Sequence, residues 1–132
     1  MKLASLESHY VDVHGLRTHF VSAGSGPALI LLHGFPDTHA IWRHQIPVLA
    51  ASGFRVIAPD MRGYGNTDAP PATGAYAIEF LCADILGLMD KLGLEKASLV
   101  GHDWGGVVGW QLCMNAPQRF ERFVALSTGH PA

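Results

Sequence analysis

The sequence predicts an α/β domain with a mostly parallel, doubly wound sheet that is preceded by an antiparallel hairpin. Short apolar runs typical of strands alternate with longer segments of helical periodicity along most of the chain. Residues 28–32 are apolar at every position, as expected of a strand that is covered on both faces. Two runs that carry Val, Tyr, Thr and Phe flank Gly15 ahead of this strand, which indicates a hairpin.

The first three strands have clear local signals. The hairpin strands are expected over residues 7–14 and 16–23, on either side of the turn at Gly15. A turn of glycine, serine and proline over residues 24–27 then leads into the apolar run over 28–32. That run is too short for a helix and is bounded by turn residues, so we interpret it as a central strand of the sheet.

A helix is predicted over residues 38–51, where apolar residues recur at helical spacing. It begins beside the capping candidates Asp37 and Thr38, and Gly53 follows its last turn. The β-branched and apolar run over 55–58 then predicts the next strand. A strand, a helix and a strand in this order predict a parallel connection.

The second half of the chain repeats this alternation. A polar, glycine-rich loop over residues 60–74 runs into a helix over about 77–92, which Gly93 ends. The remaining expected elements are a strand over 96–100, a helix over about 104–116 that Pro117 ends, and a strand over 123–127. No helix follows this last strand to cover it, so we expect an exposed sheet edge that favours self-association.

Composition indicates a small globular protein. The 132 residues fit a single domain, and a chain that is 48% apolar and 15% charged is not disordered. A net charge of -2 without long runs of like charge gives no signal for binding nucleic acid or an acidic membrane surface. No stretch approaches the length of a membrane span, and two cysteines are too few for a disulfide scaffold, so we expect a cytoplasmic location. No motif predicts a cofactor or a metal.

The segment from Gly101 to Gly106 carries the strongest chemical signal. It places Asp103 between small residues, where a buried strand must reverse sharply into a helix. A carboxylate at a helix N-terminus is kept ionised by the helix dipole and by free amide donors, so it attacks carbon without a separate base. The alternative is that Asp103 only caps the helix, which aspartate often does.

A second motif, from His33 to Pro36, directly follows the buried strand over 28–32. In this position the backbone N–H groups of Phe35 and Trp104 are expected to converge on the oxygen that gains negative charge during the reaction. We interpret His33, Gly34 and Pro36 as support for this loop.

A third motif, from Asp60 to Thr67, follows the next strand, and its Asp60 and Arg62 are expected to hold loops together.

Taken together, the three motifs HGFP, DMRGYGNT and GHDWGG resemble those of the epoxide hydrolases of the α/β-hydrolase superfamily. The resemblance covers essentially the whole chain. It implies that Asp103 opens a small apolar epoxide by attack on the less hindered carbon, that tyrosines of a lid domain protonate the leaving oxygen, and that water activated by a histidine hydrolyses the ester. In the family the lid, the acid and the base histidine come later than these residues. The resemblance therefore implies the N-terminal portion of one hydrolase core domain, over residues 1–132, which by itself does not turn over.

Three alternatives remain open. Haloalkane dehalogenases resemble the chain through the same aspartate nucleophile, but they commonly have Asn where this sequence has Phe35. Fluoroacetate dehalogenases usually have Arg at the position of Trp104. An inactive module that self-associates through its sheet edge is the non-enzymatic alternative. Among the histidines, only His130 follows the last strand in a place suited to a general base, whereas the others are interpreted as structural or solvated.

Overall fold

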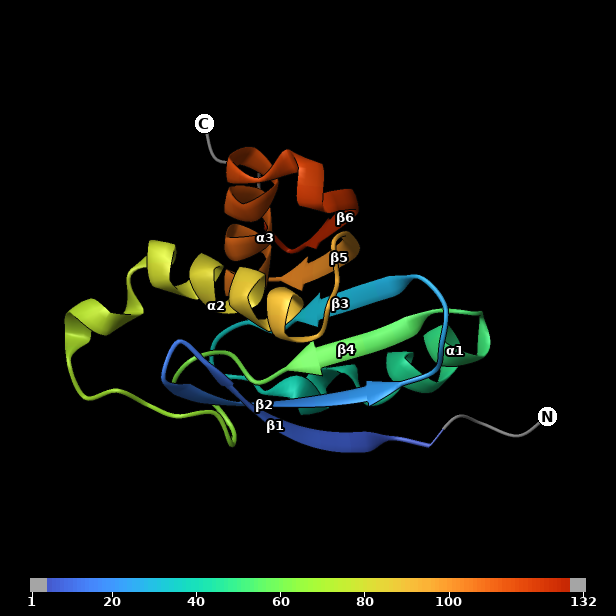
Figure 1. Ribbon diagram of the computed structural model, residues 1–132, viewed down its shortest axis with the longest axis horizontal. Helices are drawn as coiled ribbons and strands as arrows, with labels where there is room; N and C mark the ends of the chain where they lie inside the picture. Colours follow the sequence, from blue (N-terminus) through green and yellow to red (C-terminus); the bar gives the residue numbers. More distant parts are fainter. Residues whose placement is uncertain (1–4, 129–132) are drawn as a thin grey trace.

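The computed structural model describes residues 5–128, which form one sheet of six strands with helices on both faces (Figure 1). The elements are β1 (Glu7–Val13), β2 (Leu16–Ala23), β3 (Ala28–Leu32), the 3-10 helix η1 (His39–Trp42), α1 (Gln45–Ala51), β4 (Arg55–Pro59), the 3-10 helix η2 (Thr73–Tyr76), α2 (Ile78–Lys91), β5 (Ala97–His102), α3 (Trp104–Asn115), the 3-10 helix η3 (Pro117–Arg119) and β6 (Phe120–Leu126). The strand order is β1-β2-β4-β3-β5-β6. Strands β3 to β6 run parallel, and the β1–β2 and β2–β4 pairs are antiparallel, so the predicted architecture is confirmed.

The helix predicted over residues 38–51 is divided into two parts, η1 and α1. Thr38 caps η1, because its side chain accepts a hydrogen bond from the amide of Ala40 at 3.2 Å. Pro47 lies in the first turn of α1 and has no N–H to donate to the carbonyl four residues earlier. A proline is tolerated in the first turn of a helix but not in its interior, so α1 starts anew at Gln45.

Two strands are longer than predicted. β5 continues through Gly101 to His102, and β6 begins at Phe120 rather than Phe123. Glycine is poor in strands, which is why the sequence predicts the end of β5 before Gly101. Strand pairing nevertheless extends β5 through Gly101, because this residue is paired on both sides, with Leu32 of β3 and with Ala125 of β6.

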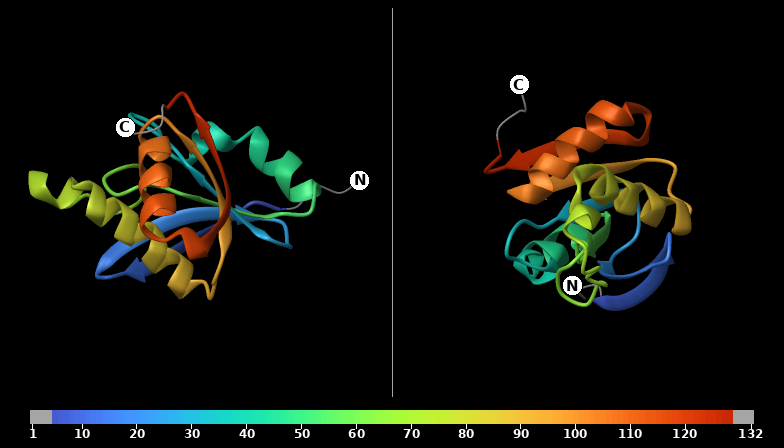
Figure 2. Two further views of the ribbon diagram at one scale, coloured as in Figure 1. Left: turned by 90° about the horizontal axis from the view of Figure 1, so that it is seen from above. Right: turned by 90° about the vertical axis from the view of Figure 1, so that its left-hand side faces the viewer.

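Helices cover both faces of the sheet (Figure 2), and each face has its own apolar core. On one face, Trp42, Ile46 and Ala50 of the η1–α1 segment pack against strand residues such as Val56. On the other face, α2 and α3 pack against the sheet through Ile85, Leu88, Val108 and Leu112. Every residue of β3 is buried because both of its faces are covered, as the unbroken apolar run predicts.

The outer edge of β6 pairs with no other strand within residues 5–128, and Val124 and Leu126 on it are 51% and 41% exposed. Self-association through this edge stays a prediction. None of the helices in the described part of the chain has the length and hydropathy needed to cross a membrane.

Candidate active site

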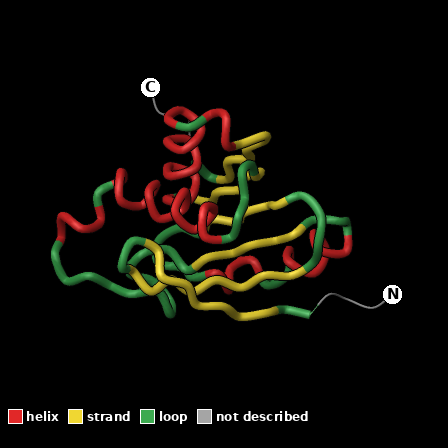
Figure 3. The backbone as a smooth tube through the Cα atoms, viewed as in Figure 1, coloured by secondary structure: helices red, strands yellow, loops and turns green. Residues whose placement is uncertain are grey.

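The three predicted motifs meet at the carboxyl ends of the central strands of the sheet. Strands β3, β4 and β5 are parallel neighbours, and each motif follows the carboxyl end of one of them (Figure 1). The tube in Figure 3 shows the long loop that leaves β4 at this edge and returns at η2 and α2. Binding sites of open α/β sheets lie at the carboxyl ends of the strands, so the carboxyl ends of β3, β4 and β5 form the candidate site.

Asp103 occupies the sharp turn between β5 and α3 with φ 57° and ψ −120°, a conformation that side-chain-bearing residues rarely adopt. The turn fits only because small residues surround it. A Cβ atom on Gly105 would collide with the carbonyl oxygen of Leu32, and one on Gly101 would collide with the carbonyl of Gly105. The predicted elbow is therefore present, with the glycines required for close packing against β3.

The Asp103 carboxylate does not cap α3, since its side chain makes no capping hydrogen bond. Instead its Oδ2 accepts a hydrogen bond from the backbone N–H of Phe35 at 3.2 Å. The amides of Trp104 and Phe35 lower the pKa of Asp103 against the smaller, opposing effect of burial. The geometry thus favours an ionised, outward-facing carboxylate over the capping interpretation. The rings of Phe35 and Trp104 are largely exposed beside it.

His33 joins the loop after β3 to the loop after β4. Its ring is 1% exposed, its Nδ1 donates to the Gly34 carbonyl at 2.9 Å, and its Nε2 accepts from the Met61 amide at 2.9 Å. Burial lowers the pKa of this histidine, so it is neutral with the proton on Nδ1. The next turn includes the cis peptide bond Phe35-Pro36 and a hydrogen bond from the Asp37 amide to the Gly34 carbonyl.

Gly34 lies directly against the elbow. A Cβ atom there would lie 2.5 Å from the Cβ of Asp103 and 2.8 Å from the carbonyl oxygen of His102. We expect Gly34→Ala to push the Asp103 carboxylate out of position and to slow the epoxide addition that the motifs predict for it about 100-fold. Gly74→Ala is the matched control, because a Cβ atom there meets nothing within 4 Å. Equal alkylation rates for the two variants, measured by intact mass, would contradict this role of Gly34.

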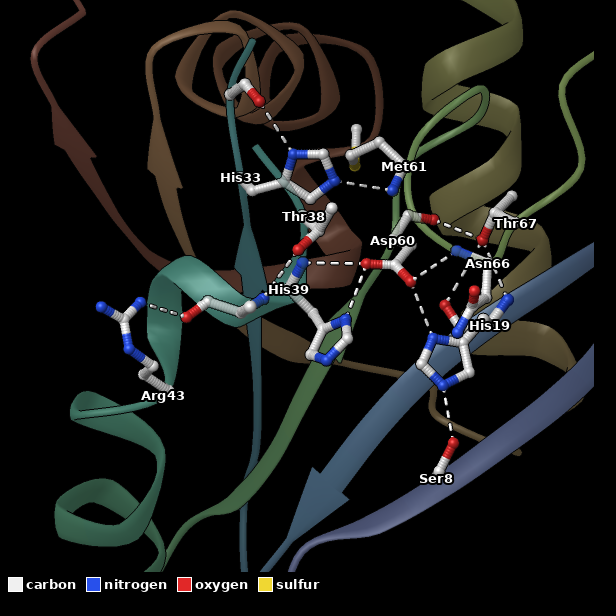
Figure 4. A network of polar contacts seen from close by, with 12 residues as sticks. Ser8, His19, His33, Thr38, His39, Arg43, Asp60, Met61, Asn66 and Thr67 are labelled. Atoms are coloured by element: carbon white, nitrogen blue, oxygen red, sulfur yellow. Dashed lines mark hydrogen bonds and ion pairs between the residues drawn. The ribbon is translucent and has the colours of Figure 1, made fainter. Parts of the chain in front are cut away.

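Asp60 is the centre of a buried polar network at the same edge (Figure 4). Its Oδ1 accepts from the amide and Nδ1 of His39 at 2.8 and 2.7 Å, and its Oδ2 accepts from Nδ1 of His19 at 2.8 Å and the amide of Asn66 at 3.1 Å. Desolvation opposes ionisation, but these four hydrogen bonds outweigh it and lower the pKa of Asp60. The expectation that Asp60 holds loops together is confirmed.

The same three side chains, His19, His39 and Asp60, are also of the types that bind transition metals. Their nitrogen–oxygen distances of 2.7 and 2.8 Å are those of direct hydrogen bonds, and each Asp60 oxygen already accepts two. Hydrogen bonding therefore accounts for this cluster, and the sequence indicates only a structural role for the two histidines.

Arg62 fixes the loop after β4 to α2. Its guanidinium makes two hydrogen bonds to the carboxylate of Asp84, at 2.9 and 2.8 Å, and a third to the Ala75 carbonyl at 2.9 Å. The pair is largely buried, and a bidentate geometry of this kind resists displacement. The loop-holding role expected for Arg62 is confirmed, and its partners could not be read from the sequence.

A mostly apolar pocket of about 190 Å³ opens beside Asp103, and we call it the Tyr64 pocket. It is lined by His33, Gly34, Met61, Arg62, Tyr64, Tyr76, Leu81, Trp104 and Val108. The sequence indicates packing or loop roles for Tyr64 and Tyr76. No spacing pattern could reveal that they share a pocket, because Tyr76 lies twelve residues further along the chain and only the folded loop brings its ring beside Gly63. His130, the candidate base, lies outside the described residues.

The sheet order, the glycine-lined elbow and the loop amide facing it define a hydrolase-type α/β core. The family model described as alpha/beta hydrolase fold matches residues 27–132, and the chain belongs to this family. That result confirms the superfamily inferred from the three motifs.

Its relatives include epoxide hydrolases. The chain is 43% identical over 125 residues to epoxide hydrolase 2 of Siraitia grosvenorii and 50% identical over 126 residues to bifunctional epoxide hydrolase 2 of Sus scrofa. These matches cover 95% of the chain but 40% and 23% of the relatives. The crystal structure of an epoxide hydrolase from Vigna radiata matches with a TM-score of 0.91 and 45% identity, over 93% of this chain and 38% of that one. The chain therefore spans two fifths or less of these relatives.

Proposed function

We propose that the chain is the nucleophile-bearing portion of an epoxide hydrolase, and that Asp103 is the nucleophile. The observation that carries the proposal is the position of the Asp103 carboxylate, outward-facing on the elbow and in contact with the Phe35 amide. An Asp103 oxygen attacks an epoxide carbon, the carbon–oxygen bond of the epoxide breaks, and the released oxygen takes a proton from water. The product is an alkyl ester of Asp103 that water later converts into a diol.

The amides of Phe35 and Trp104 have a role in the second step of this mechanism. When water attacks the ester, negative charge develops on the carbonyl oxygen of Asp103, and preorganised N–H donors stabilise that charge. The two amides already lower the pKa of the carboxylate, which supports their placement for this purpose. The names of the relatives, together with Phe35 in the loop, favour epoxide over halide chemistry.

The test is to incubate the chain with styrene oxide and to follow its intact mass. We expect one epoxide to add per chain, with Asp103 as the modified residue on peptide mapping. His33 at the same edge has both ring nitrogens occupied, so we expect slow hydrolysis and accumulation of the ester. Modification at another residue, or release of chloride from a chloroalkane at a rate that exceeds epoxide addition, would refute the proposal.

A further inference from the structure

We propose that the Tyr64 pocket is a subsite for one uncharged substituent of about the size of a benzene ring, and that Tyr64 determines which substituents enter it. This inference rests on the proposed function, since the substituent is the one carried by the epoxide that Asp103 attacks.

The position of the pocket is the first support. Gly34 and Trp104 line it, and both are immediate neighbours of Asp103: Gly34 by van der Waals contact and Trp104 along the chain. Leu81 and Val108 close it from α2 and α3. A molecule bonded to the Asp103 carboxylate would therefore have this space within reach, on the α2–α3 side of the sheet.

The size of the pocket limits what it holds. Complete binding sites for small molecules measure roughly 300–1,000 Å³, and a cavity of about 150 Å³ accepts one benzene molecule. The Tyr64 pocket, at about 190 Å³, has room for a single ring or a short branched chain. It is thus a subsite for part of a substrate.

Apart from the Tyr64 hydroxyl, the polar side chains that line the pocket already have hydrogen-bond partners, so the pocket disfavours charged substituents. All three guanidinium nitrogens of Arg62 are hydrogen-bonded to Asp84 or to the Ala75 carbonyl. Both ring nitrogens of His33 are occupied, and the Tyr76 hydroxyl donates to the Pro70 carbonyl at 2.7 Å. A carboxylate or ammonium entering this space would lose its water shell and gain at most one hydrogen bond, to the Tyr64 hydroxyl, which does not offset the cost of burying a charge.

Tyr64 differs from the other polar residues of the pocket. In the described part of the chain its hydroxyl makes no hydrogen bond, and its ring stands edge-on to His33 and Phe35 at centroid distances of 5.3 and 6.3 Å. Burial, together with the charge of Asp103, raises the pKa of Tyr64, so the hydroxyl stays a donor. The neighbouring Gly63 packs so closely that a Cβ atom there would lie 2.6 Å from the Tyr76 ring. The Tyr64 ring therefore forms a fixed side of the pocket, and its hydroxyl can donate one hydrogen bond to a bound molecule.

The test measures binding of unreactive diols, so that it does not depend on Asp103 chemistry. Phenyl glycol, its para-carboxy derivative and naphthyl glycol are titrated into the chain while the methyl resonances of Met61, Leu81 and Val108 are followed. We expect saturable shifts with phenyl glycol and none with the carboxylate. Tyr64→Ala should raise the affinity for naphthyl glycol relative to phenyl glycol about tenfold, whereas Tyr64→Phe, which keeps the ring, should leave that ratio near the wild-type value.

Leu81→Trp provides a second, independent readout because it fills the pocket from α2. It should weaken phenyl glycol binding about tenfold, whereas Val48→Trp, at a position on α1 that is 64% exposed, should not. Styrene oxide should alkylate Leu81→Trp more slowly by the same factor, and the rate with propylene oxide, whose methyl group does not fill the pocket, should fall less. Val48→Trp should leave both rates unchanged. Absence of diol binding while propylene oxide still alkylates Asp103, or an unchanged naphthyl preference in Tyr64→Ala, overturns the subsite. Diol binding without any alkylation supports the subsite and refutes the proposed function instead.

Discussion

Asp103→Asn is expected to lower the rate of epoxide addition at least about 10⁴-fold, because a neutral amide is not a nucleophile and no other group replaces it. The variant should fold, since Asn has nearly the same shape as Asp and tolerates a positive φ at least as well. The rate of mass increase with styrene oxide measures the effect, and circular dichroism confirms that the fold is retained.

The pH dependence of the same reaction tests the environment of Asp103. The amides of Trp104 and then Phe35 hold the pKa of this carboxyl below its ordinary value of 3.8, so the reactive carboxylate form persists in acid. The alkylation rate should therefore stay level as the pH falls from 8 to about 5, and should decline only below 3.8. A decline centred near neutral pH would mean that another group controls the nucleophile.

Asp37→Asn is the matched control for Asp103→Asn. Asp37 lies in the loop after β3, at the same edge of the sheet, and the substitution removes the same charge. If both variants lose reactivity equally, the local charge and not the nucleophile explains the effect. If Asp103→Asn retains the wild-type rate, the capping interpretation of Asp103 is restored and the proposed function fails.

Structural features that depend on local residue patterns could be predicted from the sequence alone. The strand over residues 28–32 is predicted with its observed bounds, because full burial on both faces requires an unbroken apolar run. The elbow is predicted because a strand that turns this sharply into a helix needs small residues on both sides of the aspartate. Glycine is required at Gly101 and Gly105, two residues on either side of Asp103, because this turn packs tightly against itself and against β3.

Features that depend on distant contacts could not be predicted in the same way. The partners of Asp60 come from β2, η1 and the loop after β4, and no periodicity links His19, His39 and Asn66. The break between η1 and α1, ahead of Pro47, is readable in principle, since proline is tolerated in the first turn of a helix and rarely beyond it. The apolar spacing on both sides of this break indicates a single helix instead, because it reflects the common face that both pieces bury.

The buried Asp60 network is expected to contribute strongly to stability. Asp60→Asn should lower the free energy of unfolding by about 3–5 kcal/mol. The carboxylate is fully buried and both oxygens accept two hydrogen bonds. An amide replaces one acceptor oxygen with an NH₂ group, which would face donors from His39 or from His19 and Asn66. Urea unfolding at neutral pH measures the loss.

The control and the pH dependence make this prediction specific. Asp90 is likewise paired with a basic side chain, that of Arg119, but it is 66% exposed, so Asp90→Asn should cost less than about 1 kcal/mol. The folded-state pKa of Asp60 is lowered, so its contribution is complete above the ordinary value of 3.8 and is lost as the pH falls through the folded-state pKa. The difference between wild type and Asp60→Asn should therefore shrink only in strong acid. Equal losses for the two variants would mean that the Asp60 network contributes no more to stability than a surface ion pair.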